Sequence, residues 1–273
     1  MQLAKPGDAQ PPLHGRRVAI VRAIQEPYSL APAIQSLGAQ VVVYPSVEII
    51  LVEDALRVAG LTPDAPFTPF DWLLLPTMDA VLALAQAQHA SLLPAASLSQ
   101  ARLAVFGALA QQAAAELLGV TPSAAGDDAP EDLLRVMRLA AAPGPRVLLV
   151  QSAAAKRDWR ARLQAAGASV TVLPLYRARL PQGGDPLPVE LWSGTVDAIL
   201  FGGETDVRYF AARLKHDGGV LAMLDHVCIA CLDRATARAA RSLGLRPAVI
   251  ADQATPAALA GAVAAYLAKP VRA

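Results

Sequence analysis

Alternating strand and helix patterns occur twice along this chain, and this internal repeat constrains the fold more than any other feature of the sequence. The apolar, β-favouring run at residues 17–21 (RVAIV) returns at residues 146–150 (RVLLV). In each copy a helical stretch follows, a glycine ends it, and a second strand is predicted to stop at a proline. A separation of 129 positions is shared by three pairs of landmarks: Val18 and Val147, Gly38 and Gly167, and Pro45 and Pro174.

Two further pairs of segments complete the repeat. The strands predicted at 71–75 and 197–201 are 126 positions apart, and those predicted at 103–106 and 228–231 are 125 positions apart. Small deletions in a duplicated chain produce such a drift, whereas chance similarity between alanine-rich segments is the alternative explanation. The sequence therefore predicts two copies of one α/β unit.

The repeat predicts an α/β protein with two similar lobes, each a parallel sheet flanked by helices on both faces. Parallel sheets bind their ligands outside the carboxyl ends of the strands. We therefore expect the function to reside in the turns that lead from strand to helix, with the ligand in a cleft between the lobes. These turns are predicted at residues 76–79, 107–111, 202–206 and 232–236.

Composition narrows the choice of partner and location. Of the 273 residues, 54% are hydrophobic and 17% are charged, which suffices for two cores, and the net charge is +1. Basic residues form no run of four, so no nucleic-acid partner is expected. Apolar stretches fall short of the ~18 residues of a membrane span. Residues 1–15 lack a signal-peptide core and are predicted to be a disordered leader, so we expect a cytoplasmic protein with no membrane partner.

Cysteine and histidine placement gives no indication of a metal site. Cys228 and Cys231 lie in the apolar run VCIACL, which predicts a buried strand in which cysteine acts as a small hydrophobic residue. A redox or metal site is the alternative, but two further ligands do not accompany the pair. The four histidines show no ligand spacing, and no glycine-rich phosphate-binding motif occurs.

Several short sequence motifs resemble those of the uroporphyrinogen-III synthase family, and the resemblance extends from about residue 16 to 265. They are a first strand followed by Arg22, GAQVVVYP at 38–45, LPTMDAV at 75–81, LPLYR at 173–177 and DRATA at 233–237. The chain departs from the family pattern at three places. Gly202 and Gly203 replace a Thr-Ser turn, Asp233 replaces a glycine, and Gln111 takes the position assigned to a threonine in the first copy.

The resemblance implies a lyase of tetrapyrrole and heme biosynthesis that needs no cofactor. Its substrate would be hydroxymethylbilane, a linear tetrapyrrole with eight carboxylates, and its product uroporphyrinogen III. The reaction loses water, closes the ring and inverts the last pyrrole. We expect this small molecule to be the partner of the protein and the protein to be a monomer.

The topology that the resemblance implies divides the chain discontinuously. Residues 16–44 and 181–268 would form the first lobe, and residues 51–172 the second. Residues 45–50 and 173–180 would be the two strands of a hinge.

Tyr176 is the predicted catalytic residue, because a phenol stays protonated at neutral pH and can donate to the departing hydroxyl. Packing at the hinge is the alternative role for this side chain. The other candidates bind substrate and lie in turns or after strands: Arg22, Thr77, Met78, Gln111, Arg157, Gly202, Gly203 and Thr236. Glycines permit close approach of backbone amides to a carboxylate, and arginines can pair with one. The alternatives are helix caps for the threonines, a tight turn for the glycines and surface charges for the arginines.

Two other functions remain open at this point. A non-catalytic bilobal sensing or regulatory protein of the same fold would explain why Gly202, Gly203 and Asp233 depart from the family pattern. A solute receptor of an uptake system would share the bilobal shape but would need an export signal.

Overall fold

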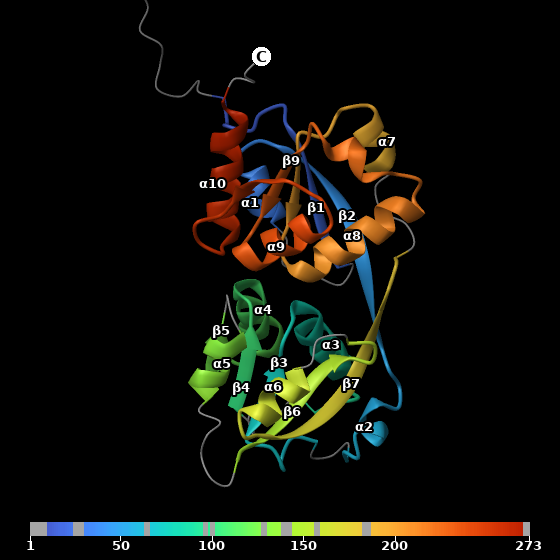
Figure 1. Cartoon of the computed structure of the whole chain (residues 1–273), viewed down its shortest axis with the longest axis vertical. Coiled ribbons are helices and arrows are strands. Elements are labelled where there is room, and N and C mark those ends of the chain that lie inside the picture. The colour runs from blue at the N-terminus through green and yellow to red at the C-terminus, as the bar shows by residue number, and fades with distance from the viewer. Residues whose placement is uncertain are drawn as a thin grey trace, which may run out of the picture. The chain divides into compact units, whose positions relative to one another are not determined.

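The computed structural model describes residues 10–23, 30–62, 66–94, 98, 102–126, 130–137, 144–155, 159–181 and 187–269 (Figure 1). The chain divides into two compact units: unit 1 is Met1–Val47 with Leu180–Ala273, and unit 2 is Glu48–Arg179. The lobes and hinge strands predicted from the sequence, and a ligand-binding cleft between the lobes, stay predictions.

Unit 1 contains a parallel sheet with the strand order β10-β9-β8-β1-β2. Its strands are β1 (Arg17–Ala23), β2 (Gln40–Leu51, whose last four residues belong to unit 2), β8 (Ala198–Phe201), β9 (Cys228–Cys231) and β10 (Pro247–Ile250). Its helices are α1 (Ala31–Gln35), α7 (Leu187–Trp192), α8 (Glu204–His216), the short 3-10 helix η2 (Leu221–Leu224), α9 (Arg234–Ser242) and α10 (Pro256–Leu267).

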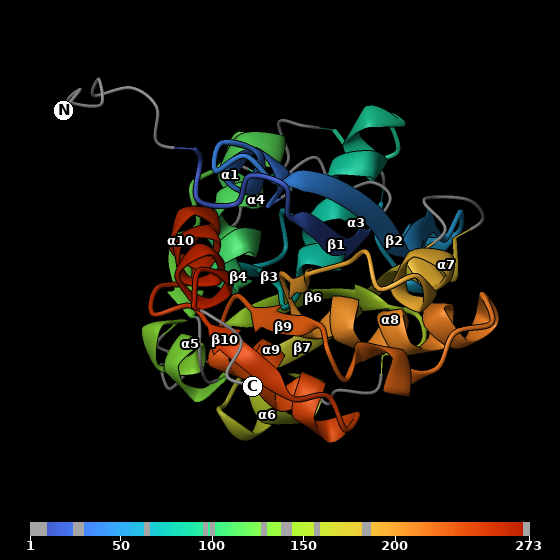
Figure 2. The ribbon, with the colours of Figure 1, turned by 90° about the horizontal axis from the view of Figure 1, so that it is seen from above.

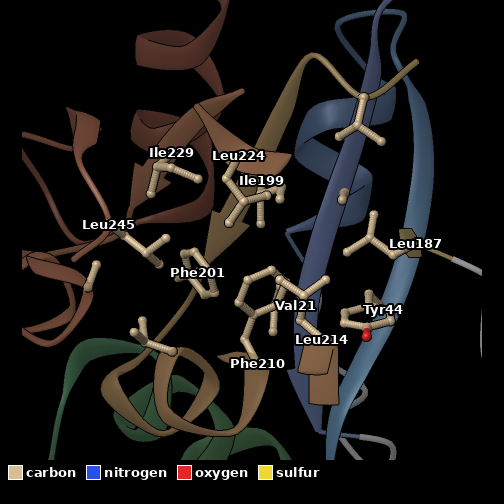
Figure 3. Packing of buried hydrophobic residues seen from close by; sticks show 14 of the residues in the cluster. Val21, Tyr44, Leu187, Ile199, Phe201, Phe210, Leu214, Leu224, Ile229 and Leu245 are labelled. Atoms are coloured by element: carbon tan, nitrogen blue, oxygen red, sulfur yellow. The ribbon is translucent and has the colours of Figure 1, made fainter. Parts of the chain in front are cut away.

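The sheet of unit 1 has a hydrophobic layer on each face, because successive strand residues point to opposite sides. Val21 of β1 belongs to a cluster that α7, α8 and α9 cover, in which Phe201 and Phe210 pack edge to face with ring centroids 5.2 Å apart (Figure 3). Val18 and Ile20, which are also buried, point to the opposite face. There α1 and α10 contact each other, as Figure 2 shows.

Unit 2 repeats this architecture with the strand order β5-β4-β3-β6-β7. Its strands are β3 (Trp72–Leu75), β4 (Arg102–Phe106), β5 (Ala124–Gly126), β6 (Arg146–Ser152) and β7 (Ser169–Arg179). Its helices are α2 (Ala55–Val58), α3 (Met78–His89), α4 (Ala108–Leu118), α5 (Pro130–Met137) and α6 (Trp159–Ala165). Helices α5 and α6 cover one face around Trp72 and Leu74, and α3 and α4 contact each other on the other.

The two sheets agree in register as well as in strand order. Val18 pairs with Val41 in unit 1, and Val147 pairs with Val170 in unit 2, so the separation of 129 positions holds on both strands. Both strand pairs also have a register shift at equivalent places, between Arg22 and Ala23 and between Gln151 and Ser152. This agreement supports duplication, because a chance similarity of composition would not reproduce an irregularity of pairing.

The prediction that Pro45 and Pro174 end their strands is wrong. Strands β2 and β7 continue through these prolines, and Glu48–Leu51 then pair with Tyr176–Arg179 in the antiparallel sense. Proline is tolerated because each one lies at the register shift, where β2 or β7 is paired on one side only in the part of the chain that the structure describes. The antiparallel pair is the link through which the ten described strands follow one another in a single hydrogen-bonded order.

A polar network holds β2 where it passes Pro45. The Arg213 side chain of α8 is 5% exposed, and its Nη1 donates to the Pro45 carbonyl at 2.8 Å. Its Nε and the Tyr44 hydroxyl both donate to Oδ2 of Asp217, at 2.8 and 2.9 Å. Burial raises the pKa of the Asp217 carboxyl, but hydrogen bonds from His216, Arg213 and Tyr44 outweigh it and hold the pKa below its usual value.

We predict that Asp217→Asn removes an acid-sensitive part of the stability of unit 1. A carboxylate with a lowered pKa in the folded state stabilises the protein above its unfolded pKa of about 4, and this contribution is lost as the pH falls through the folded pKa. At pH 7 the variant should lose about 1–3 kcal/mol in free energy of unfolding. Urea unfolding at several pH values would measure this, and a difference from wild type that does not shrink under acid would contradict it.

Candidate functional site

The turns predicted to hold the function are places where a strand leads directly into a helix. They connect β3 to α3, β4 to α4, β8 to α8 and β9 to α9. The first backbone N–H groups of a helix have no partner within it, so they can bind an anionic group. The side chain at each cap decides whether these N–H groups are available.

Thr77 is the cap residue of α3. Its backbone is extended, and its Oγ1 accepts a hydrogen bond from the Ala80 amide at 3.3 Å. Met78 follows as the half-buried first residue of the helix. The capping role that the sequence offered as an alternative for Thr77 is therefore present.

Tyr176 on β7 lies against this cap. Its side chain is buried, and its hydroxyl is 3.2 Å from Thr77 Oγ1. The register shift between Gln151 and Ser152 explains this position, because Leu175 is then an extra residue on β7. An extra residue moves the following side chains to the other face of a sheet, and that is the face where α3 contacts β7. The structure thus brings together two residues that the sequence predicted separately.

Gly107 is a feature of the same sheet edge that the residue predictions missed. It caps α4 with φ +100°, a backbone conformation that favours glycine, and apart from Gly107 itself, Phe106 and Ala108 no described residue has an atom within 4 Å of where its Cβ would be. The first turn of α4 holds neither a side-chain cap nor an acidic residue. A glycine directly between a predicted strand and a predicted helix was the available sequence signal.

In unit 1, Gly203 takes the place that Thr77 has in unit 2. Gly203 caps α8 in extended conformation without a side chain, after the half-buried Gly202. The first turn of α8 also contains Glu204 and Asp206, and Glu204 pairs with Arg208 at 2.8 Å. The negative charge of these two carboxylates disfavours the binding of an anionic ligand at the amino-terminal end of α8.

Asp233 caps α9 and accepts a hydrogen bond from the Thr236 amide at 2.6 Å. Thr236 is fully buried, and its hydroxyl has no hydrogen-bond partner among the described residues. Aspartate at this position therefore acts as an ordinary helix cap, which explains how the chain tolerates the loss of the family glycine.

The separation of 125 positions placed Gln111 in the first copy where the second copy has Thr236, and this equivalence is wrong. Leu73 pairs with Leu103 and Ile199 pairs with Ile229, so β4 and β9 are 126 positions apart. The cap residues Gly107 and Asp233 keep that separation, which makes Ala110 the counterpart of Thr236. The separation between the two copies therefore falls from 126 to 125 positions within α4 and α9, before Gly119 and Gly244.

Of the two predicted arginines, only Arg22 belongs to the described residues. Arg22 lies near the end of β1, half-buried and in register with Pro45. Arg157 lies outside the described residues.

The prediction that Cys228 and Cys231 belong to a buried strand is confirmed. They are two of the four residues of β9, and burial raises the pKa of each thiol to about 12. Thiols in this state are poor nucleophiles and poor metal ligands at neutral pH. Within the described ranges, no group of three His, Cys, Asp or Glu side chains could hold a metal ion. None of the helices described there combines the length and the apolar character needed to cross a membrane.

The sequence and the architecture of this chain are similar to those of known proteins. The uroporphyrinogen-III synthase HemD family matches residues 29–261. A mutant uroporphyrinogen III synthase from Thermus thermophilus superposes with a TM-score of 0.59 at 23% identity, covering 93% of this chain and 100% of its own. The enzyme from Helicobacter pylori superposes with a TM-score of 0.53 at 15% identity, covering 92% and 99%. No curated protein sequence matches the chain significantly.

The paired parallel sheets and their strand-to-helix turns define a duplicated α/β protein with a hydroxyl pair at one turn. The chain belongs to the uroporphyrinogen-III synthase family, whose members are lyases of tetrapyrrole biosynthesis.

Proposed function

We propose that this chain converts hydroxymethylbilane into uroporphyrinogen III, and that Tyr176 and Thr77 assist the loss of water. The family match supports the reaction. The observation that supports the assignment of residues is the distance of 3.2 Å between the Tyr176 hydroxyl and Thr77 Oγ1. We further propose that the enzyme acts as a cytoplasmic monomer without a cofactor.

Tyr176 acts as the general acid in this proposal. Its O–H donates a proton to the terminal hydroxyl of the substrate as the carbon–oxygen bond breaks, and water leaves. The carbocation that remains is stabilised by the nitrogen of its own pyrrole, and the last pyrrole attacks it through the α-carbon that already carries a methylene bridge. The bond from that carbon to the bridge then breaks, which inverts the last pyrrole and leaves a cation on the bridge carbon, stabilised by the neighbouring pyrrole. The free α-carbon of the last pyrrole attacks this second cation and closes the ring, and its ring proton returns to the phenolate of Tyr176.

Thr77 stabilises the phenolate formed in the first step. One lone pair of its Oγ1 accepts from the Ala80 amide, and its own proton is positioned to be donated toward the Tyr176 oxygen. Thr77 also caps the amino-terminal end of α3, and the partial positive charge of that helix end favours a negative charge on the Tyr176 oxygen.

The carboxylate arms of the substrate bind to backbone amides and cations in the remaining turns. The uncapped first turn of α4 after Gly107 is the best suited, because it holds no acidic side chain. The other proposed substrate-binding residues are Arg22, Met78, Gln111, Arg157, Gly202, Gly203 and Thr236. Folding the flexible substrate into a ring would contribute much of the rate, since well-oriented intramolecular reactions gain up to roughly 7–11 kcal/mol.

The reaction is tested with freshly prepared hydroxymethylbilane, followed by oxidation and separation of the porphyrin isomers. We expect isomer III from the protein and isomer I from the spontaneous reaction without it. Isomer I alone in the presence of folded protein would reject the enzyme and favour the non-catalytic sensing or regulatory alternative.

Tyr176→Phe should lower kcat by about 100-fold, because general acid catalysis contributes at least that much. KM should change little, since the ring is retained. Single-turnover rates measure the step directly, and thermal unfolding checks that the buried ring still packs. A Tyr176→Phe variant with the wild-type rate would remove the acid role without affecting the family assignment.

Thr77→Val should lower kcat by about tenfold, whereas Thr77→Ser should keep most of the activity, because serine retains both the cap and the donor. Valine also removes the cap and should cost about 1 kcal/mol of stability. The two variants are therefore compared below the unfolding temperature of the weaker one. Equal rates for the valine and serine variants would contradict the role of Thr77.

A further inference from the structure

Helix α9 presents a face made only of arginine. Arg234, Arg238 and Arg241 are spaced by four and three residues and are all exposed. At 100° per residue they lie within roughly 60° of one another around the helix axis. The opposite face is buried and consists of Ala235, Thr236, Ala237 and Ala240. Helical spacing separates these charges along the sequence, so they form no run of consecutive basic residues.

These three arginines differ from most other described arginines in having no acidic partner. Among the described residues, no carboxylate lies within 4 Å of their guanidinium groups, whereas arginines elsewhere in the chain form ion pairs, such as Arg16 with Asp197 and Arg208 with Glu204. The acidic side chain nearest in sequence is Asp233, whose Oδ1 accepts the Thr236 amide. The row therefore keeps its positive charge in a chain whose net charge is only +1.

The row begins at a turn already assigned to the substrate. Arg234 is the first residue of α9, one position after the cap Asp233 and two before Thr236. Arg238 and Arg241 continue along the helix for about 10 Å at a rise of 1.5 Å per residue. Three cations at this spacing match a ligand that carries several carboxylates on flexible arms.

We infer that Arg234, Arg238 and Arg241 form an electrostatic capture surface for the polycarboxylate substrate of the proposed reaction. The inference rests on the proposed function for the identity of the ligand. Exposed charges of one sign raise the rate at which an oppositely charged ligand is captured, and salt screens this effect. The surface therefore acts on kcat/KM and leaves the chemical step unchanged.

The test replaces the three residues together, as Arg234→Gln, Arg238→Gln and Arg241→Gln, in the full chain. At low ionic strength kcat/KM should fall by about tenfold with kcat unchanged, and the difference should disappear at high salt. The matched control is Arg57→Gln, Arg135→Gln and Arg160→Gln, which removes the same charge from exposed positions of unit 2. An equal loss in the control, or a wild-type salt dependence in the α9 variant, would overturn the inference.

A binding measurement separates this inference from the proposed function. Fluorescence titration with uroporphyrin, which has eight carboxylates, should show weaker binding to the α9 variant than to wild type and to the control. Coproporphyrin, which has four carboxylates, should show a smaller difference. Loss of uroporphyrin binding in a protein that forms no isomer III would reject the reaction but support the capture surface. If duplex DNA bound the wild-type protein more tightly than uroporphyrin does, and lost this binding in the α9 variant, the assignment of the surface to the substrate would be overturned.

Discussion

The register shift beside each duplicated proline is the constraint on which the rest of this structure depends. An extra residue on β2 and on β7 lets each strand pass a residue that cannot donate a hydrogen bond, so the strands continue and can pair with each other. In unit 2 the same shift moves Tyr176 to the face of the sheet where α3 begins. A regular strand of the same sequence would place this phenol on the face covered by α5 and α6.

The two copies have kept their scaffold and changed their helix caps. Thr77 and Gly203 occupy equivalent positions, yet one presents a hydroxyl and the other only backbone. Gly107 and Asp233 are likewise equivalent, and here unit 2 has the bare backbone while unit 1 has a carboxylate. Strand register depends on many hydrogen bonds at once, whereas a cap depends on one side chain, so caps can diverge without loss of the fold.

Positive charge is balanced locally in most of the chain but not on helix α9. Most described arginines have an acidic neighbour, and the network of Arg213, Asp217 and Tyr44 ties α8 to β2 inside unit 1. The arginines of α9 form no ion pair with any described residue, so a chain of nearly neutral composition still presents a strongly basic helix face. Composition averages over the whole chain, whereas a ligand meets one surface at a time.

The amino-acid sequence by itself determined the duplicated α/β units and the turns that lead into helices, whereas the strand order came from the structure. The units and the turns follow from hydrophobic periodicity and from glycines such as Gly38 and Gly167, whose positive φ ends a helix locally. Only the tertiary structure decided that Pro45 and Pro174 lie within strands, that Ala110 and not Gln111 corresponds to Thr236, and that Tyr176 contacts Thr77. Each of these depends on which residue of a neighbouring strand lies opposite. That choice is made by pairing between segments far apart in the chain, so no local pattern records it.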